Sequence, residues 1–171
     1  MSNNAWIAVP LAAISTSIYA AEYFNTEQVQ QVIFPNTFLT PVALTLNDVQ
    51  VQQIEKSTGI EVHNRNVRAW KAPNGSWLII DEVLGKHEFI TYAVGINANG
   101  TIKQIEIMKY LESYGFNIHD AAWRKQFVGK SSKDPIQLNN DIANISGATL
   151  SSKHVTDGVK RVLATYAVMS K

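Results

Sequence analysis

The sequence predicts an α+β fold, in which helices pack at the face and ends of an antiparallel sheet. Apolar stretches of strand length follow one another through short turns rich in Gly and Asn, as antiparallel strand pairs do. Most stretches with helical spacing of apolar residues stand before or after these strands. The 171 residues, 46% of them hydrophobic and 17% charged, are enough to form one buried core.

The first half of the chain predicts two helices and an edge strand. Thr26 is expected to be the N-cap of a short helix. A strand is expected over residues 38–46, at a sheet edge, because Pro41 cannot donate a hydrogen bond. Asn47-Asp48 is expected to begin a second helix that ends at Gly59.

Two hairpins follow in the middle of the chain. Residues 66–72 and 76–84 flank Pro73-Asn74-Gly75, and residues 89–96 and 101–110 flank a turn that ends in Asn99-Gly100. Turns of this composition join neighbouring antiparallel strands. A short helix over 121–127 and a long helix over 151–169 are expected to complete the fold.

Residues 1–21 carry no charged side chain, and residues 5–21 are apolar and rich in small side chains. This pattern is typical of a secretory signal peptide, although residues 1–4 contain no Lys or Arg. The stretch is also just long enough for an uncleaved N-terminal membrane anchor, and a buried helix interrupted by Pro10 is the third reading. We expect residues 22–171 to form a single domain in a periplasmic or otherwise extracytoplasmic location.

Composition excludes several classes of function. The 15 Lys and Arg residues nearly balance 14 Asp and Glu residues, so the chain lacks the basic surplus of a nucleic-acid binder. The absence of cysteine excludes thiolate catalysis, disulfide frameworks and iron–sulfur ligation. The four histidines show no metal-ligand spacing, and the sequence contains no GxSxG, GxGxxG or P-loop motif. Neither a metal site nor catalytic residues are predicted.

The segment Ser146-Gly147-Ala148-Thr149 leads into the last predicted helix, for which Ser151 or Ser152 is the expected N-cap. Thr149 would then lie just outside a helix N-terminus, where free N–H groups and the helix dipole favour a phosphate. The alternative is that these Ser and Thr side chains serve only to cap the helix.

Ser146-Gly147-Ala148-Thr149-Leu150-Ser151 resembles the flavinylation motif of the FMN-binding domain family. This family includes flavin subunits of the Rnf complex and of the sodium-translocating NADH:quinone reductase, and small exported proteins that the chain resembles most. The resemblance extends over about residues 77–166, and Glu112-Ser113-Tyr114-Gly115 stands where the family carries Glu-Thr-Pro-Gly. Asp141 lies one residue further upstream than the family's Asp before the motif.

The resemblance implies a flavoprotein with FMN esterified to Thr149 through a phosphodiester bond, a phosphothreonyl-FMN. A magnesium-dependent FAD:protein FMN transferase would attach the cofactor. The phosphate would lie against Ser146, Gly147, Ala148, Leu150 and Ser151, and the isoalloxazine against Glu112, Ser113, Tyr114 and Gly115. The protein would carry electrons between membrane or extracytoplasmic redox partners, rather than act as an enzyme on its own substrate.

Two other functions remain open from the sequence. One is a module that binds FMN or another phosphorylated ligand without a covalent bond. The other is an exported structural or sensory domain without a cofactor. Tyr110, Trp123 and Phe127 are candidates for the wall of a flavin pocket, with core packing as their alternative role.

Overall fold

The computed structural model describes residues 21–112 and 116–170. The predicted signal peptide or anchor therefore lies outside the described residues, except for Ala21. Ser113, Tyr114 and Gly115, predicted to contact the flavin ring, also lie outside them.

The described residues form an antiparallel sheet of strand order β1-β6-β5-β4-β3-β2. The strands are β1 (Ala21–Glu22), β2 (Thr40–Thr45), β3 (Asn66–Lys71), β4 (Trp77–Leu84), β5 (Phe89–Ile96) and β6 (Ile102–Tyr110). Both predicted hairpins are confirmed, as β3–β4 and β5–β6. Pro41 lies in β2 at one edge of the sheet, where no ladder bond requires its missing N–H.

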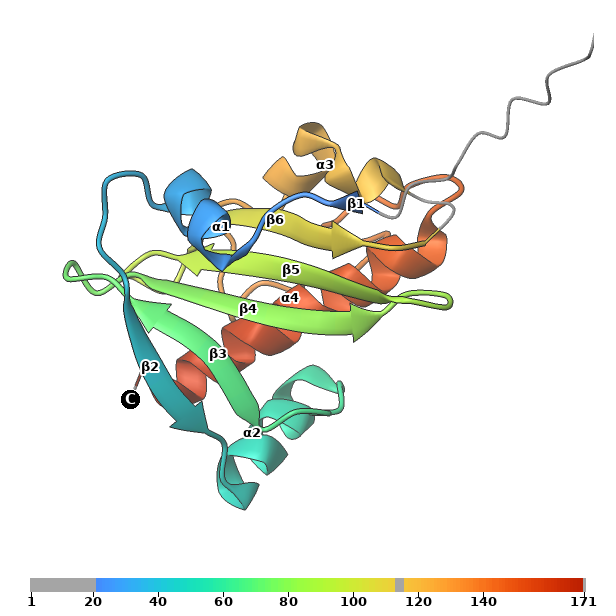
Figure 1. The fold of residues 1–171 in the computed structure, drawn as a ribbon. Helices are drawn as coiled ribbons and strands as arrows, with labels where there is room; N and C mark the ends of the chain where they lie inside the picture. Colours follow the sequence, from blue (N-terminus) through green and yellow to red (C-terminus); the bar gives the residue numbers. More distant parts are fainter. Residues whose placement is uncertain (1–20, 113–115, 171) are drawn as a thin grey trace, which may run out of the picture.

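Helices pack on both faces of this sheet (Figure 1). They are α1 (Thr26–Ile33), α2 (Asp48–Thr58), the 3-10 helix η1 (Phe116–His119), α3 (Ala121–Lys125) and α4 (Thr149–Met169). α1 covers one face, α4 runs along the other, and α2 packs against α4. The α+β prediction is confirmed.

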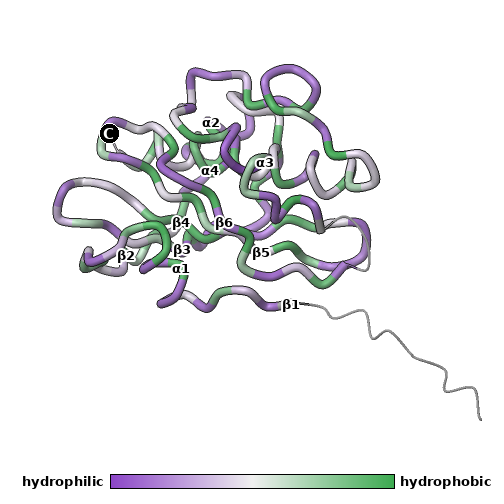
Figure 2. The backbone as a smooth tube through the Cα atoms, turned by 90° about the horizontal axis from the view of Figure 1, so that it is seen from above, coloured by the Kyte–Doolittle hydropathy of each residue, from purple (hydrophilic) through white to green (hydrophobic). Residues whose placement is uncertain are grey.

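The central strand β4 has buried neighbours on both of its faces. Ile79 and Val83 join the core beneath α4, whereas Leu78 and Ile80 join the core beneath α1. This explains the apolar run of residues 77–80 in β4, since a strand covered on one side would alternate with polar residues. Figure 2 shows the same arrangement, with hydrophobic stretches along the central strands and hydrophilic ones mainly in the outer loops.

A partly buried polar cluster fixes α4 to the sheet. The Arg161 guanidinium donates to Asp81 Oδ2 at 2.7 Å, and the Tyr92 hydroxyl donates to the same oxygen at 2.8 Å. Burial works against the charged form of Arg161, but the Asp81 carboxylate holds the pKa of Arg161 above its ordinary value. The long helix is therefore held in one register on β4.

Two predicted helix starts were wrong. α1 begins after Asn25, not Thr26: the Asn25 side chain accepts the Gln28 N–H, and Gln28 bonds back to the Asn25 N–H. α4 begins at Thr149, two residues before the predicted start. The start of α2 after Asn47 and its end at Gly59, which has a φ of 72°, are confirmed.

Candidate functional site

The N-terminus of α4 has no side-chain cap. Ala148 occupies the cap position and offers no hydrogen-bonding side chain, so the first N–H groups of a 21-residue helix remain without such a partner. Thr149 is exposed as the first helical residue. The preceding Gly147 has a φ of 81°, and a Cβ there would meet nothing within 4 Å. A phosphate thus has both space and N–H donors beside the Thr149 hydroxyl.

The two serines predicted as N-caps have other partners. The buried Ser151 hydroxyl lies 3.1 Å from the hydroxyl of Tyr110. The fully buried Ser152 hydroxyl lies 2.9 Å from the Ala148 carbonyl, one turn back. Neither serine caps α4, because both belong to its first turn.

Tyr110, the last residue of β6, brings a second segment to this end of the sheet. Its ring contacts the His119 ring edge-on, with centroids 5.7 Å apart, and Tyr23 lies on His119 at 3.9 Å. Burial, followed by the charge of Arg124, lowers the pKa of His119 to about 4. His119 is thus neutral at pH 7, and its buried Nε2 has no hydrogen-bond partner.

Glu112 joins the segment after β6 to the turn between β4 and β5. Its carboxylate is buried and accepts the His87 N–H at 2.7 Å and the Glu88 N–H at 3.1 Å. Burial raises the pKa of Glu112, but these backbone hydrogen bonds outweigh it and hold the pKa below the ordinary value. A Cβ on Gly85 would lie 2.5 Å from the Glu112 carboxylate and 3.0 Å from the Glu88 carbonyl oxygen, so a larger residue at position 85 would displace the carboxylate.

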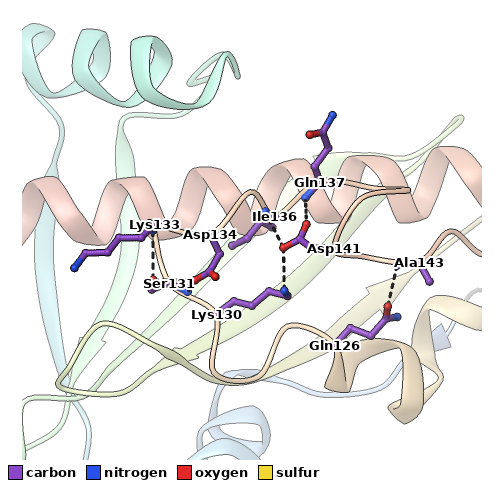
Figure 3. A network of polar contacts seen from close by, with 9 residues as sticks. All are labelled: Gln126, Lys130, Ser131, Lys133, Asp134, Ile136, Gln137, Asp141 and Ala143. Carbon is purple, nitrogen blue, oxygen red and sulfur yellow. Dashed lines mark hydrogen bonds and ion pairs between the residues drawn. The ribbon is translucent and has the colours of Figure 1, made fainter.

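Asp141 organises the loop that precedes the motif (Figure 3). Its carboxylate accepts from Lys130 Nζ at 2.9 Å, from the Gln137 N–H at 2.8 Å and from the Ile136 N–H at 3.2 Å. Burial opposes ionisation of this carboxyl, but these donors keep the pKa of Asp141 lowered. The negative charge of Asp141 is therefore balanced by Lys130 and by backbone N–H groups of its own loop.

Asn144 is a site residue that sequence reasoning missed. Its amide nitrogen donates to the Thr149 hydroxyl oxygen at 3.2 Å, and its amide oxygen accepts from the Ser152 hydroxyl at 2.9 Å. The sequence offers one signal for this role. Asn144 stands shortly before the last predicted helix, and Asn side chains often form hydrogen bonds with nearby groups of the chain.

The structure gathers the described predicted residues around two features. The first feature is the start of α4, which is surrounded by exposed Ser146, Gly147, Thr149 and Leu150 and by buried Ala148 and Ser151. The second is Glu112, which follows the end of β6 at Tyr110 and whose carboxylate is directed to the β4–β5 turn.

The three aromatic candidates for a pocket wall are buried in the core beneath α4. The indole N–H of Trp123 donates to the Ala143 carbonyl at 2.8 Å, which fixes the loop before the motif. Tyr110, Trp123 and Phe127 therefore have the alternative role given above, packing in the core.

A cavity of about 770 Å³ lies on the other flank of α4, against β3 and β4. Asp81, His154 and Arg161 are among its lining residues, but the predicted site residues within the described part of the chain are not. Residues 21–112 and 116–170 also contain no cluster of His, Cys, Asp and Glu suited to a metal ion. No helix among them has the length and apolarity needed to cross a membrane.

Comparison with known proteins finds a family match for the second half of the chain. Residues 85–164 match the FMN-binding domain. This part of the chain is similar to the FMN-binding domain family. The FMN-binding domain thus includes the β4–β5 turn, Glu112 and the complete motif at the start of α4, whereas α1, β2, α2 and β3 lie outside the matched range.

The chain is also similar to one subunit of the Na(+)-translocating ferredoxin:NAD(+) oxidoreductase complex of Acetobacterium woodii. The two are 36% identical over 86 residues, which cover 45% of this chain and 42% of that protein. The chain therefore spans less than half the length of this relative. No solved structure matches the chain.

Proposed function

We propose that the protein is an electron carrier whose FMN is attached to Thr149 by a phosphodiester bond. The observation that carries this proposal is the exposed Thr149 hydroxyl at an uncapped helix N-terminus, within an FMN-binding domain. A flavin supplies reversible electron transfer, and the protein contributes binding, orientation and tuning of the ring.

The residues around Thr149 fit an FMN phosphate. Gly147 and Ala148 leave the backbone accessible, and the N–H groups of the first turn can bind the phosphate oxygens. Ser146 and Leu150 are exposed beside this position, and Ser151 lies beneath it. For the isoalloxazine we propose the surface near Glu112, Ser113, Tyr114 and Gly115. Glu112 would act there by fixing the β4–β5 turn, because its carboxylate is bound to that turn.

Attachment requires a transferase and FAD. In the proposed step the Thr149 oxygen attacks the phosphorus of the FMN half of FAD, so an O–P bond forms. The bond between the two phosphates breaks, and AMP leaves. The hydroxyl proton passes to a base of the transferase or to water. We propose a magnesium-dependent FAD:protein FMN transferase as the partner for this step.

The setting proposed for this carrier is extracytoplasmic, with residues 1–21 as signal peptide or anchor and 22–171 as its domain. The relative from Acetobacterium woodii belongs to an oxidoreductase complex. That resemblance supports membrane redox partners for this chain. We also propose that extracytoplasmic partners can take this place, and that the chain transfers electrons rather than acts on a separate substrate.

Intact-mass measurement after co-expression with the transferase tests the covalent bond. The wild-type chain and Thr149→Ser should gain one FMN minus one water, because both retain the hydroxyl. Thr149→Ala should stay at the apo mass, and Ser146→Ala, the matched control, should still be labelled. Flavin that is released on unfolding, or wild-type chain that stays colourless at the apo mass, would contradict the proposal.

A further inference from the structure

The Thr149 hydroxyl is held by a side chain outside the motif. Asn144 Nδ2 donates to Thr149 Oγ1 at 3.2 Å, across five positions of sequence. The contact joins the loop before the motif to the first residue of α4. Both residues are exposed, so a macromolecule that approaches this end of the domain can reach the hydroxyl.

Asn144 is itself fixed from below. Its amide oxygen accepts from the hydroxyl of Ser152, a fully buried residue, at 2.9 Å. The preceding residue is held on both sides, because the Ala143 N–H donates to Gln126 Oε1 at 2.8 Å and the Ala143 carbonyl accepts from Trp123 Nε1 at 2.8 Å. Figure 3 shows the Gln126–Ala143 hydrogen bond beside the contacts of Asp141. The amide therefore has a defined position relative to α4.

The direction of the hydrogen bond suits attack by Thr149. Because Asn144 donates, it occupies a lone pair of the hydroxyl oxygen and leaves the hydroxyl hydrogen without a role in the contact. That hydrogen can be removed by an external base, while the remaining lone pair attacks phosphorus. Without Asn144, an exposed threonine at the first helical position could place its hydroxyl in more than one rotamer.

We propose that Asn144 is a positioning residue that holds the Thr149 hydroxyl in the orientation required for FMN attachment. The inference rests on the proposed function, in which Thr149 displaces AMP from FAD with loss of its hydroxyl proton. Orientation of a reacting atom acts mainly on the rate of the chemical step, so Asn144 contributes to turnover more than to transferase binding.

The test measures the initial rate of FMN attachment by the purified transferase, with FAD and Mg²⁺ in excess and the full chain varied in concentration. Asn144→Leu, which keeps similar volume and removes both hydrogen bonds, should lower kcat about ten-fold and change KM less than about two-fold. Asn144→Asp should not restore the rate, because a carboxylate only accepts hydrogen bonds and would engage the Thr149 hydroxyl hydrogen that has to leave.

Asn66→Leu is the matched control, since it makes the same substitution at an exposed Asn, which accepts from the Thr45 hydroxyl on the β2–β3 side of the sheet, away from Thr149. It should be labelled at nearly the wild-type kcat. Equal rates for Asn144→Leu and wild type would overturn the inference, as would equal losses in Asn66→Leu and Asn144→Leu, or a wild-type rate for Asn144→Asp. Asn144→Ala provides a second test if the leucine variant fails to fold. Absence of label on the wild-type chain and on Thr149→Ser would instead refute the proposed attachment itself.

Discussion

The hydroxyl oxygens of Tyr110 and Ser151 lie 3.1 Å apart in the buried interior, so the last residue of β6 is joined to the first turn of α4. Forty-one positions separate the two residues in sequence. Between them the chain forms η1, α3 and the loop organised by Asp141. The position of Thr149 therefore depends on the sheet as well as on its own helix.

Removal of the Ser151 hydroxyl should destabilise the domain. In Ser151→Ala a buried polar contact of Tyr110 is lost, at a cost of about 1–2 kcal/mol in the free energy of unfolding. Urea denaturation followed by circular dichroism measures the change. The control is Lys153→Ala, which removes only an exposed ion pair with Asp157 and should change stability by less than about 0.5 kcal/mol. Equal stabilities of Ser151→Ala and wild type would contradict this prediction.

Glu112 should make stability depend on acid pH. Its pKa is lower in the folded state, so its contribution is fully present above the ordinary value of 4.5 and is lost as the pH falls through the folded value. At pH 7, Glu112→Gln should reduce the free energy of unfolding by about 1–3 kcal/mol, because the hydrogen bonds to His87 and Glu88 lose their charge assistance.

Urea titrations of wild type and Glu112→Gln at several pH values between 7 and 3 test this dependence. The difference between the two proteins should shrink below pH 4.5, whereas the effect of the other carboxylates cancels in the comparison. A difference that stays constant or grows in acid would show that the carboxylate has a different role.

Gly158→Ala separates packing from helix propensity. In an exposed helix this change stabilises by about 1 kcal/mol. Here the new Cβ would lie 2.2 Å from the Tyr92 hydroxyl oxygen and 2.8 Å from Val83 Cγ1, so α4 must shift away from the sheet. We expect a loss of about 2 kcal/mol or more and a lower thermal midpoint. A rise in the midpoint would mean that α4 packs less closely than described.

Gly147→Ala should cost about 1 kcal/mol of stability through backbone strain alone. The residue has a φ of 81°, which L residues with a Cβ rarely adopt, but no atom stands within 4 Å of the new Cβ. Gly147→Asn should cost less, because Asn tolerates this conformation better. Thermal unfolding of both variants gives the comparison, and equal midpoints for the two would argue against strain as the cause.

Local patterns predicted much of the fold. Pro41 indicated an edge strand, and the Gly- and Asn-containing turns indicated the two hairpins, because these signals depend only on neighbouring residues. The start of α1 was also readable, since Asn25 and Gln28 have the spacing of a capping box. Threonine is also a good cap, but Thr26 is the first helical residue of α1.

The start of α4, and the contacts that fix the loop before it, could not be predicted from local sequence, because they depend on residues from other segments. Ser151 and Ser152 resembled caps, but Tyr110 and Asn144 supply their partners from other segments. The partners of Glu112 are backbone N–H groups of a turn about 25 positions away. No residue pattern in the sequence predicts such a contact. The motif itself was found from sequence because its residues are contiguous, whereas the residue that holds its hydroxyl lies outside it.

The short strand β1 pairs with the end of β6, next to the contact between Tyr110 and the first turn of α4. Ala21 pairs with Tyr110 at the strand spacing of about 4.8 Å, and Tyr110 in turn contacts Ser151. The point where the described chain enters the sheet is thus on the same side as the start of α4. If residues 1–20 hold the domain to a membrane or a larger assembly, a group on Thr149 would face that support and exchange electrons with carriers beside it, not with carriers that approach from the opposite side.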